Sequence, residues 1–320
     1  MLSLPGRTAA ALLVALTAAC ATSAAPEPVA VQQPVRPSVS PSPSPSPSPP
    51  PPPPQLPRGG RSIFPANMVV MAYGTAGTAS LGVLGEGSPA EAARRLEADS
   101  VAWAQASGRP VLPAFELITS VAQRAPGPDG RYSVGLAHSE VQRYLDAARA
   151  AKMLLVLDFQ PGGAKILDQV KHYEKFLREP EVGIAIDPEW VLEPGQKPGR
   201  QIGSLDAASI NEVSSYLSDI VRRNRLPEKI FMVHQFKTYM LPDRELIVDR
   251  FGLATVFHVD GFGPRHSKRE TYGLLSSKDG VIPGGRVHNG YKLFIDEDVP
   301  LQDAAEVMAI EPRPELVSYQ

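Results

Sequence analysis

The nine residues VGIAIDPEW, at positions 182 to 190, decide how this sequence is expected to fold. Side chains on a β-strand alternate between its two faces. One face here carries Val182, Ile184 and Ile186, and the other carries Gly183, Ala185, Asp187 and Glu189. Branched apolar residues outside and small residues inside are typical of a strand covered by helices and crowded by neighbouring strands. The stretch therefore predicts a buried parallel strand with two carboxylates at its carboxyl end.

Other stretches share this plan of an apolar start and a polar end. They are VLPAFELIT (111–119), MLLVLDFQ (153–160), IFMVHQF (230–236), ATVFHVDGF (254–262) and YKLFID (291–296). The carboxyl ends of parallel strands meet at one rim when the strands close into a barrel. The repeated polar ends therefore predict one shared site.

Predicted strands alternate with predicted helices along the chain. A first strand is expected at 68–74 and a last one at 306–310, with helices at 88–106, 139–151, 164–177, 206–224, 243–250 and 267–276. Ser88 and Glu91 have the spacing of a capping box, and Pro89 suits the first helical position. About eight strands in roughly 260 residues favour a (β/α)₈ barrel over a doubly wound sheet. Glycine motifs of dinucleotide, P-loop and α/β-hydrolase sites do not occur.

The amino-terminal sixty residues have a different character from the rest. Residues 1–20 carry a basic residue, an apolar run and small residues before Cys20, as in a lipoprotein-type signal peptide. Residues 21–61 are rich in proline and serine and predict a disordered, extended tether, which leaves 62–320 for the barrel. We expect lipidation of Cys20 and attachment to the outer face of the cell membrane. Simple secretion is the alternative.

Composition limits the partners. A formal net charge of −2 gives no basic surface for nucleic acid, so we expect a small or neutral partner and a monomeric protein. Cys20 is the single cysteine, so the barrel contains neither a disulfide nor a thiol nucleophile. No cofactor or metal is required by the sequence pattern.

Candidate catalytic residues are the acids at the strand ends. Asp187 and Glu189 have Cα atoms about 6.5 to 7 Å apart, so both can face the barrel mouth. Two carboxylates in a partly dry mouth repel each other, and one is expected to hold a proton near neutral pH. Asp158 and Asp260 are further candidates. Asp187 and Glu189 could instead cap a loop or neutralise Arg200 or Lys197.

Candidate substrate-binding residues surround these acids. Trp190 could stack on the face of a sugar or anchor a loop. The histidines could donate hydrogen bonds, act as bases or bind a metal, and a purely structural role is an equal alternative. The full set is Tyr73, Glu116, Gln160, Trp190, His234, Gln235, His258, Lys292 and Asp296.

In its acidic strand ends and expected architecture the chain resembles barrel glycoside hydrolases, and in its leader and tether it resembles secreted lipoproteins of high-GC Gram-positive bacteria. The first resemblance implies a tethered hydrolase of glycosidic bonds, with Glu189 protonating the leaving oxygen and Asp187, Asp158 or Asp260 as nucleophile or base. Two alternatives remain open. One is a non-catalytic barrel that binds a glycan or a partner, and the other is a metal-dependent hydrolase that uses His234, His258 and Asp260 as ligands.

Overall fold

In the computed structural model of the protein, which describes residues 51–320, the stretch VGIAI forms strand β5 (Val182–Ile186). Its alternation is confirmed, because Val182, Ile184 and Ile186 belong to one apolar cluster and Ala185 belongs to another. The expected signal peptide, Cys20 and most of the expected tether lie outside the described residues. No helix within the described part combines the length and the apolar character that a membrane crossing requires.

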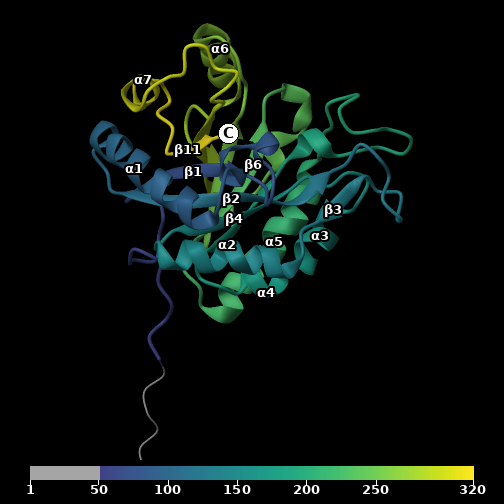
Figure 1. Ribbon diagram of the computed structural model, residues 1–320, viewed down its shortest axis with the longest axis horizontal. Helices are drawn as coiled ribbons and strands as arrows, with labels where there is room; N and C mark the ends of the chain where they lie inside the picture. Colours follow the sequence, from purple (N-terminus) through teal and green to yellow (C-terminus); the bar gives the residue numbers. More distant parts are fainter. Residues whose placement is uncertain (1–50) are drawn as a thin grey trace, which may run out of the picture. The chain divides into compact units, whose positions relative to one another are not determined.

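Eight parallel strands close into a barrel, which confirms the predicted (β/α)₈ fold. Strand β1 closes it by pairing with β2 on one side and β11 on the other. In Figure 1 the carboxyl-terminal strand β11 accordingly lies beside β1. The barrel strands are β1 (Met68–Gly74), β2 (Val111–Ala122), β4 (Leu154–Phe159), β5, β6 (Lys229–Gln235), β7 (Leu253–Val259), β10 (His288–Leu293) and β11 (Leu316–Tyr319).

Two apolar layers stabilise the barrel. One layer fills the interior of the barrel. Its residues from the middle of the strands are Met71, Ala114, Val156, Ala185, Met232 and Val256. The other lies between the outer faces of the strands and the surrounding helices, and it contains large side chains such as Trp103, Phe115, Phe231 and Phe257. Because strand side chains alternate, every barrel strand except β10 supplies apolar residues to both layers.

Helices connect most of the strands and cover the outside of the barrel (Figure 1). Helix α1 begins with the predicted capping box of Ser88 and Glu91, with Pro89 as its first residue. It ends at Gly108, which adopts a left-handed conformation with φ of 69°. The helices are α1 (Pro89–Ser107), α2 (His138–Ala150), α3 (Ile166–His172), α4 (Glu174–Leu177), α5 (Ala207–Asn224), α6 (Arg265–Leu275) and α7 (Ala304–Met308).

Three short strands stand outside the barrel. Strand β3 (Ser133–Gly135) folds back antiparallel on the extended end of β2. Strands β8 (Val281–Ile282) and β9 (Gly285–Arg286) form a separate hairpin between α6 and β10. Together they lengthen the connections without changing the order of the barrel strands.

The prediction of a last strand at 306–310 is wrong. These residues lie in or just after helix α7, and the eighth barrel strand is β11. The reason is a second capping box, in which Asp303 accepts a hydrogen bond from Glu306 N and the Glu306 carboxylate accepts one from Asp303 N. This local bonding starts a helix where the apolar run alone predicts a strand.

The expected helix at 243–250 is also wrong, and a single 3₁₀ turn, η5 (Arg244–Leu246), stands there. Two backbone hydrogen bonds, from Leu246 N to Asp243 O and from Ile247 N to Arg244 O, form this short turn, and further bonds tie the segment to helix α5. Asn211 donates to Leu246 O and accepts from Val248 N, and Asp243 accepts from Ala207 N. The segment thereby caps and covers α5 without becoming helical.

The amino ends of the barrel strands are closed by residues that precede β1. Leu56, Ile63 and Phe64 belong to the interior cluster, and Ile63 N donates to Glu228, the residue before β6. Leu56 falls within the segment expected to be tether, and only 3% of it is exposed. This plug leaves the opposite end, where the strands finish, as the open mouth.

Replacing Gly183 by alanine tests the crowding inside the barrel. A Cβ at this position would lie 2.6 Å from Ile230 O, a backbone atom of the neighbouring strand. We expect Gly183→Ala to lower the free energy of unfolding by about 1–3 kcal/mol, the usual cost of overpacking. Chemical denaturation followed by circular dichroism measures the change.

The matched control is Gly273→Ala on the exposed side of α6, where an added Cβ meets no atom within 4 Å. Helix propensity favours alanine there by up to about 1 kcal/mol. Equal stability of the two variants would contradict the assignment of Gly183 to the crowded interior.

Candidate active site at the carboxyl ends of the strands

A small cavity of about 140 Å³ opens at the carboxyl ends of the barrel strands. Three acids, one lysine and a rim of aromatic rings line it. The complete lining is Tyr73, Leu81, Gln160, Asp187, Glu189, Trp190, Phe236, Asp260, Phe262, Lys292, Phe294 and Gln320. We call this cavity the mouth; it contains most of the residues that the sequence marks as candidates.

The turn after β5 fixes Asp187 and Glu189. Asp187 caps the 3₁₀ turn η3 (Pro188–Trp190) by accepting a hydrogen bond of 3.1 Å from Glu189 N. Gly203 N donates to Glu189 O at 2.7 Å, and a Cβ on Gly203 would lie 2.3 Å from Val191 O. This close backbone approach needs glycine, and it holds the turn that carries both acids.

Below the mouth, His234 joins two carboxylates from distant parts of the chain. Its Nε2 lies 2.8 Å from Glu116 Oε1, and its Nδ1 lies 3.1 Å from Asp260 Oδ2. Asp158 Oδ1 is 3.8 Å from Nε2, which is too far for a hydrogen bond. Glu116, Asp158 and His234 are fully buried, and Asp260 is 7% exposed.

His234 and Asp260 stabilise each other in their charged forms. Burial disfavours the charged form of His234, but the carboxylates of Glu116 and Asp260 outweigh it and raise the pKa of His234 well above its usual value. Burial likewise opposes ionisation of Asp260, but the hydrogen bond and the charge of His234 outweigh burial and lower the pKa of Asp260. His234 therefore keeps Asp260 ionised at the edge of the mouth.

The remaining acids are shifted toward the protonated form. Burial, with the charge of Asp260 adding to it, raises the pKa of Glu189 to about 7. Burial also raises the pKa of Asp187 well above its usual value, and it raises the pKa of Asp158 to about 6. The mouth thus combines an ionised carboxylate with a carboxyl group that holds a proton near neutral pH.

His258 takes a different role from His234. It lies opposite His234 in the register of β6 and β7, but its Nε2 is hydrogen-bonded to Ser318 Oγ at 2.8 Å. Its Nδ1 faces Gly290, where a Cβ would approach to 2.2 Å. Burial and the charge of His234 lower the pKa of His258 well below its usual value. His258 is therefore a neutral side chain inside the barrel.

Tyr73, Gln160 and Lys292 complete one wall of the mouth. Gln160 Nε2 donates to Tyr73 Oη at 3.3 Å, and Gln160 Oε1 accepts from Ala122 N at 3.0 Å. The Lys292 ammonium lies 3.6 Å from the centre of the Tyr73 ring, a cation–π contact. Burial and the charge of Asp158 raise the pKa of Tyr73 well above its usual value, so the phenol stays neutral.

Two candidate binding residues lie outside both the mouth and the buried cluster beneath it. Gln235 follows His234 on β6 and faces outward, where it bonds to Lys237 O and to Arg244 Nη1. Asp296 lies beyond the end of β10 and is exposed. The expected strand at 291–296 begins and ends three residues earlier, at His288–Leu293, which is why its last acid falls outside the barrel.

Five residues that line the mouth are outside the candidate set from the sequence: Leu81, Phe236, Phe262, Phe294 and Gln320. Gln320 lies two residues beyond Ser318, so the alternation along β11 could have found it if that strand had been placed correctly. Phe294 follows β10, and Leu81 stands in the 3₁₀ turn η1 (Ala79–Leu81) after β1.

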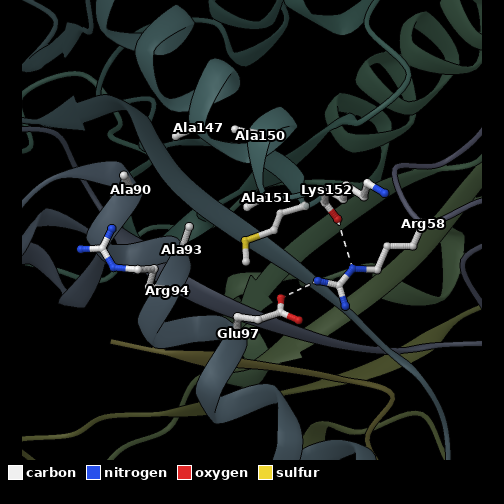
Figure 2. Close-up of a pocket in the computed structure, with 10 residues that line it drawn as sticks. Arg58, Ala90, Ala93, Arg94, Glu97, Ala147, Ala150, Ala151 and Lys152 are labelled. Atoms are coloured by element: carbon white, nitrogen blue, oxygen red, sulfur yellow. Dashed lines mark hydrogen bonds and ion pairs between the residues drawn. The ribbon is translucent and has the colours of Figure 1, made fainter.

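A second and larger hollow, of about 710 Å³, lies between α1 and α2. Figure 2 shows that small alanines line it and that Arg58 binds Glu97 and Lys152 O at its rim. Met153, immediately before β4, also lines it, which places this hollow away from the mouth. It contains neither a histidine nor a group of carboxylates, so the mouth is the better candidate for chemistry.

No protein-family model matches the chain, and no curated protein matches it. A (β/α)₈ barrel supports many unrelated reactions, so the fold alone does not select one. The function therefore has to be argued from the residues of the mouth.

A buried ion pair holds the loops on one side of the mouth. Lys268 Nζ on α6 lies 2.7 Å from Asp298 Oδ2, and both side chains are 1% exposed. Lys268 also donates to Gly261 O and Lys292 O, while Asp298 accepts from Gly263 N and Phe294 N. The pair thereby links the loops that carry Phe262 and Phe294.

Asp298→Asn tests this ion pair. Removing the carboxylate leaves a buried ammonium without its counter-ion, so we expect the free energy of unfolding to fall by about 3–5 kcal/mol. Denaturant unfolding measures the loss. The double variant Asp298→Asn with Lys268→Met should lose less than the sum of the two single variants, because the charges are removed together.

The surface pair Arg143–Glu140, in which both side chains are more than one third exposed, is the control. Arg143→Met is expected to change stability by less than about 1 kcal/mol. If Asp298→Asn lowers the free energy of unfolding by as little as Arg143→Met does, the Lys268–Asp298 ion pair does not hold the loops as assigned.

Proposed function

We propose that the mouth is the active site of a hydrolase that cleaves glycosidic bonds by acid–base catalysis. The observation that carries the proposal is the raised pKa of Glu189, about 7, in a cavity that also holds the carboxylate of Asp260. Glycosidases need one carboxyl group to donate a proton and a second, ionised one to act as base or nucleophile.

Glu189 is the proposed general acid. It is half-buried on the rigid turn η3, and it takes part in no ion pair among the described residues. Its proton is thus available to a leaving oxygen that enters the mouth. A carboxyl group whose pKa lies near the working pH is the most effective proton donor.

Asp260 is the proposed base or nucleophile, since it lines the same cavity and is fixed through its Oδ2 by His234. Oδ1 of Asp260 has no hydrogen-bond partner among the described residues. This oxygen is itself buried, so the proposed reaction brings the water or the sugar carbon into contact with the Asp260 carboxylate at the inner wall of the mouth. Asp187 lines the cavity too, but its carboxylate caps η3. Asp158 does not line the mouth, and we assign it no step of cleavage.

The shape and lining of the mouth favour a carbohydrate. Trp190, Phe236, Phe262 and Phe294 give flat apolar faces, and Lys292 and Gln160 give hydrogen-bond donors. At about 140 Å³ the cavity is smaller than the roughly 300–1,000 Å³ of a pocket for a drug-sized ligand. We therefore propose that it takes one terminal sugar unit while the rest of a glycan lies across the rim.

Glu189→Gln tests the proposed acid. Release of reducing sugars from a panel of bacterial wall glycans and plant polysaccharides is expected from the purified wild-type protein. The variant is expected to be slower by about 10²–10⁴-fold, the usual contribution of a general acid.

Glu193→Gln is the matched control, because Glu193 is exposed in the same loop and lines no part of the mouth. It should retain the wild-type rate. If the wild-type protein binds a glycan without releasing reducing ends, the barrel is a receptor and the proposed reaction is wrong.

The pH profile provides a second test. Glu189 must be protonated to act as an acid, and its pKa is about 7. We therefore expect kcat/KM to be high below pH 7 and to fall about tenfold for each pH unit above it. With a nitrophenyl glycoside, whose leaving group needs no proton, this fall is expected to be weak or missing. A steep fall with both kinds of substrate would assign the titration to another group.

Attachment to a membrane through Cys20, or secretion without a lipid, stays a prediction from residues 1–61. Either location is consistent with a glycan substrate, because cell-wall and environmental polysaccharides lie outside the cell membrane. The glycosidase proposal does not depend on it.

A further inference from the structure

The barrel interior directly below the mouth holds three side chains of the kinds that bind metals. They are Glu116 on β2, Asp158 on β4 and His234 on β6, and one ligand atom from each lies within 4.8 Å of the others. All three are fully buried. The strands fix their backbones, so their ligand atoms stand on a rigid frame.

Hydrogen bonding leaves this cluster incomplete. Neither oxygen of Asp158 has a hydrogen-bond partner among the described residues, and Glu116 Oε2 has none. Buried polar oxygens are nearly always paired, because an unpaired one loses its hydration without replacement. Three such oxygens in one small volume point to a ligand that accepts electron pairs from oxygen.

The charge of the region points to a cation. Five acidic side chains meet in the mouth and beneath it: Glu116, Asp158, Asp187, Glu189 and Asp260. The basic side chains among them are His234 and Lys292. A divalent ion would offset this excess of carboxylates where water is excluded.

The spacing of the ligand atoms suits a small divalent ion. Ligands about 2.1 Å from a metal lie about 3.0 Å apart at right angles and about 3.4 Å apart in a tetrahedron. Nε2 of His234 is 2.8 Å from Glu116 Oε1 and 3.8 Å from Asp158 Oδ1. The first separation is slightly shorter than the right-angle value, and the second is slightly longer than the tetrahedral value.

The surroundings of His234 also match those of a metal ligand. Histidines that bind metals usually give their second ring N–H to a carboxylate, which orients the ring. Here Nδ1 of His234 faces Asp260 Oδ2 at 3.1 Å, so Nε2 is directed toward Glu116 and Asp158.

We infer that Glu116, Asp158 and His234 form a binding site for one divalent transition-metal ion of the Zn²⁺ or Mn²⁺ class, with Asp260 as the residue that orients His234. An imidazole and two carboxylates are suitable ligands for these ions. The set differs from the His234, His258 and Asp260 ligands suggested by the sequence. His258 bonds to Ser318, and Asp260 lies on the opposite ring nitrogen of His234.

A hydrogen-bonded cluster without metal is the competing explanation. It accounts for Glu116 Oε1 and Asp260 Oδ2, which both contact His234. It does not account for Asp158, whose carboxylate stands beside them without a partner. A variant of Asp158 therefore distinguishes a metal site from a hydrogen-bonded cluster without metal.

The test is a titration of the full-length protein, dialysed against a chelator, with Zn²⁺ and separately with Mn²⁺. Calorimetry gives the affinity, and elemental analysis after desalting gives the stoichiometry. We expect one ion per chain and a rise in the melting temperature on loading. Asp158→Asn is expected to weaken binding by more than about 100-fold and to abolish that rise, because losing a ligand costs more than the roughly 10–100-fold cost of losing an outer partner.

Two further variants make the test specific. Glu189→Gln removes an acid of the mouth and is expected to keep one ion per chain, so loss of glycan cleavage and loss of metal are separate results. Asp260→Asn is expected to weaken binding by about 10–100-fold without removing a ligand.

Folding is checked with the metal-free proteins. Asp158→Asn removes an unpaired buried carboxylate, so its melting temperature without metal is expected to be no lower than that of the wild type. Glu116→Gln repeats the test at a second ligand. Failure of the wild-type protein to bind either ion at about 100 µM overturns the inference, and so does a folded Asp158→Asn protein that binds as tightly as the wild type.

Discussion

The closure of eight parallel strands into a barrel is the constraint on which the rest of the structure depends. Closure sends every second side chain of each strand into a narrow interior, where neighbouring backbones approach closely. At Gly183 the backbone of Ile230 leaves no room for a Cβ, and at Gly290 the ring of His258 occupies the space. Small residues on some strands thereby make room for large polar residues on others.

The interior changes character along the barrel axis. Its amino end is closed by Leu56, Ile63 and Phe64, and its middle is apolar. Its carboxyl end holds the buried acids and histidines. Since water is largely excluded there, each charge is governed by its immediate partners. This explains why Asp260, bonded to His234, has a lowered pKa while Glu189 has a raised one.

His234 connects the two levels of the site. Through Nδ1 it fixes Asp260, which lines the mouth, and through Nε2 it faces Glu116 and Asp158 in the interior. A positive centre on Nε2, whether a proton or a metal ion, therefore acts on the ionisation of the proposed base. The proposed reaction and the proposed metal site are separate, but they share this ring as their physical link.

Local patterns in the sequence were sufficient to predict the fold. The alternation in VGIAIDPEW, the capping box at Ser88 and the repeated polar strand ends each follow from backbone geometry over a few residues. The same patterns placed Tyr73, Asp187, Glu189 and Asp260 at the mouth. The predictions at 306–310 and 243–250 are wrong because the deciding hydrogen bonds come from the capping pair of Asp303 and Glu306 and from a neighbouring helix.

Only the tertiary structure decided which polar residues are partners. Glu116 and His234 are 118 residues apart in the chain, and the 2.8 Å contact between them depends on how the strands are staggered around the barrel. The sequence could mark both as polar and inward-facing, but it could not set their relative height. That height separates an acid in the mouth, such as Glu189, from one buried below it, such as Asp158.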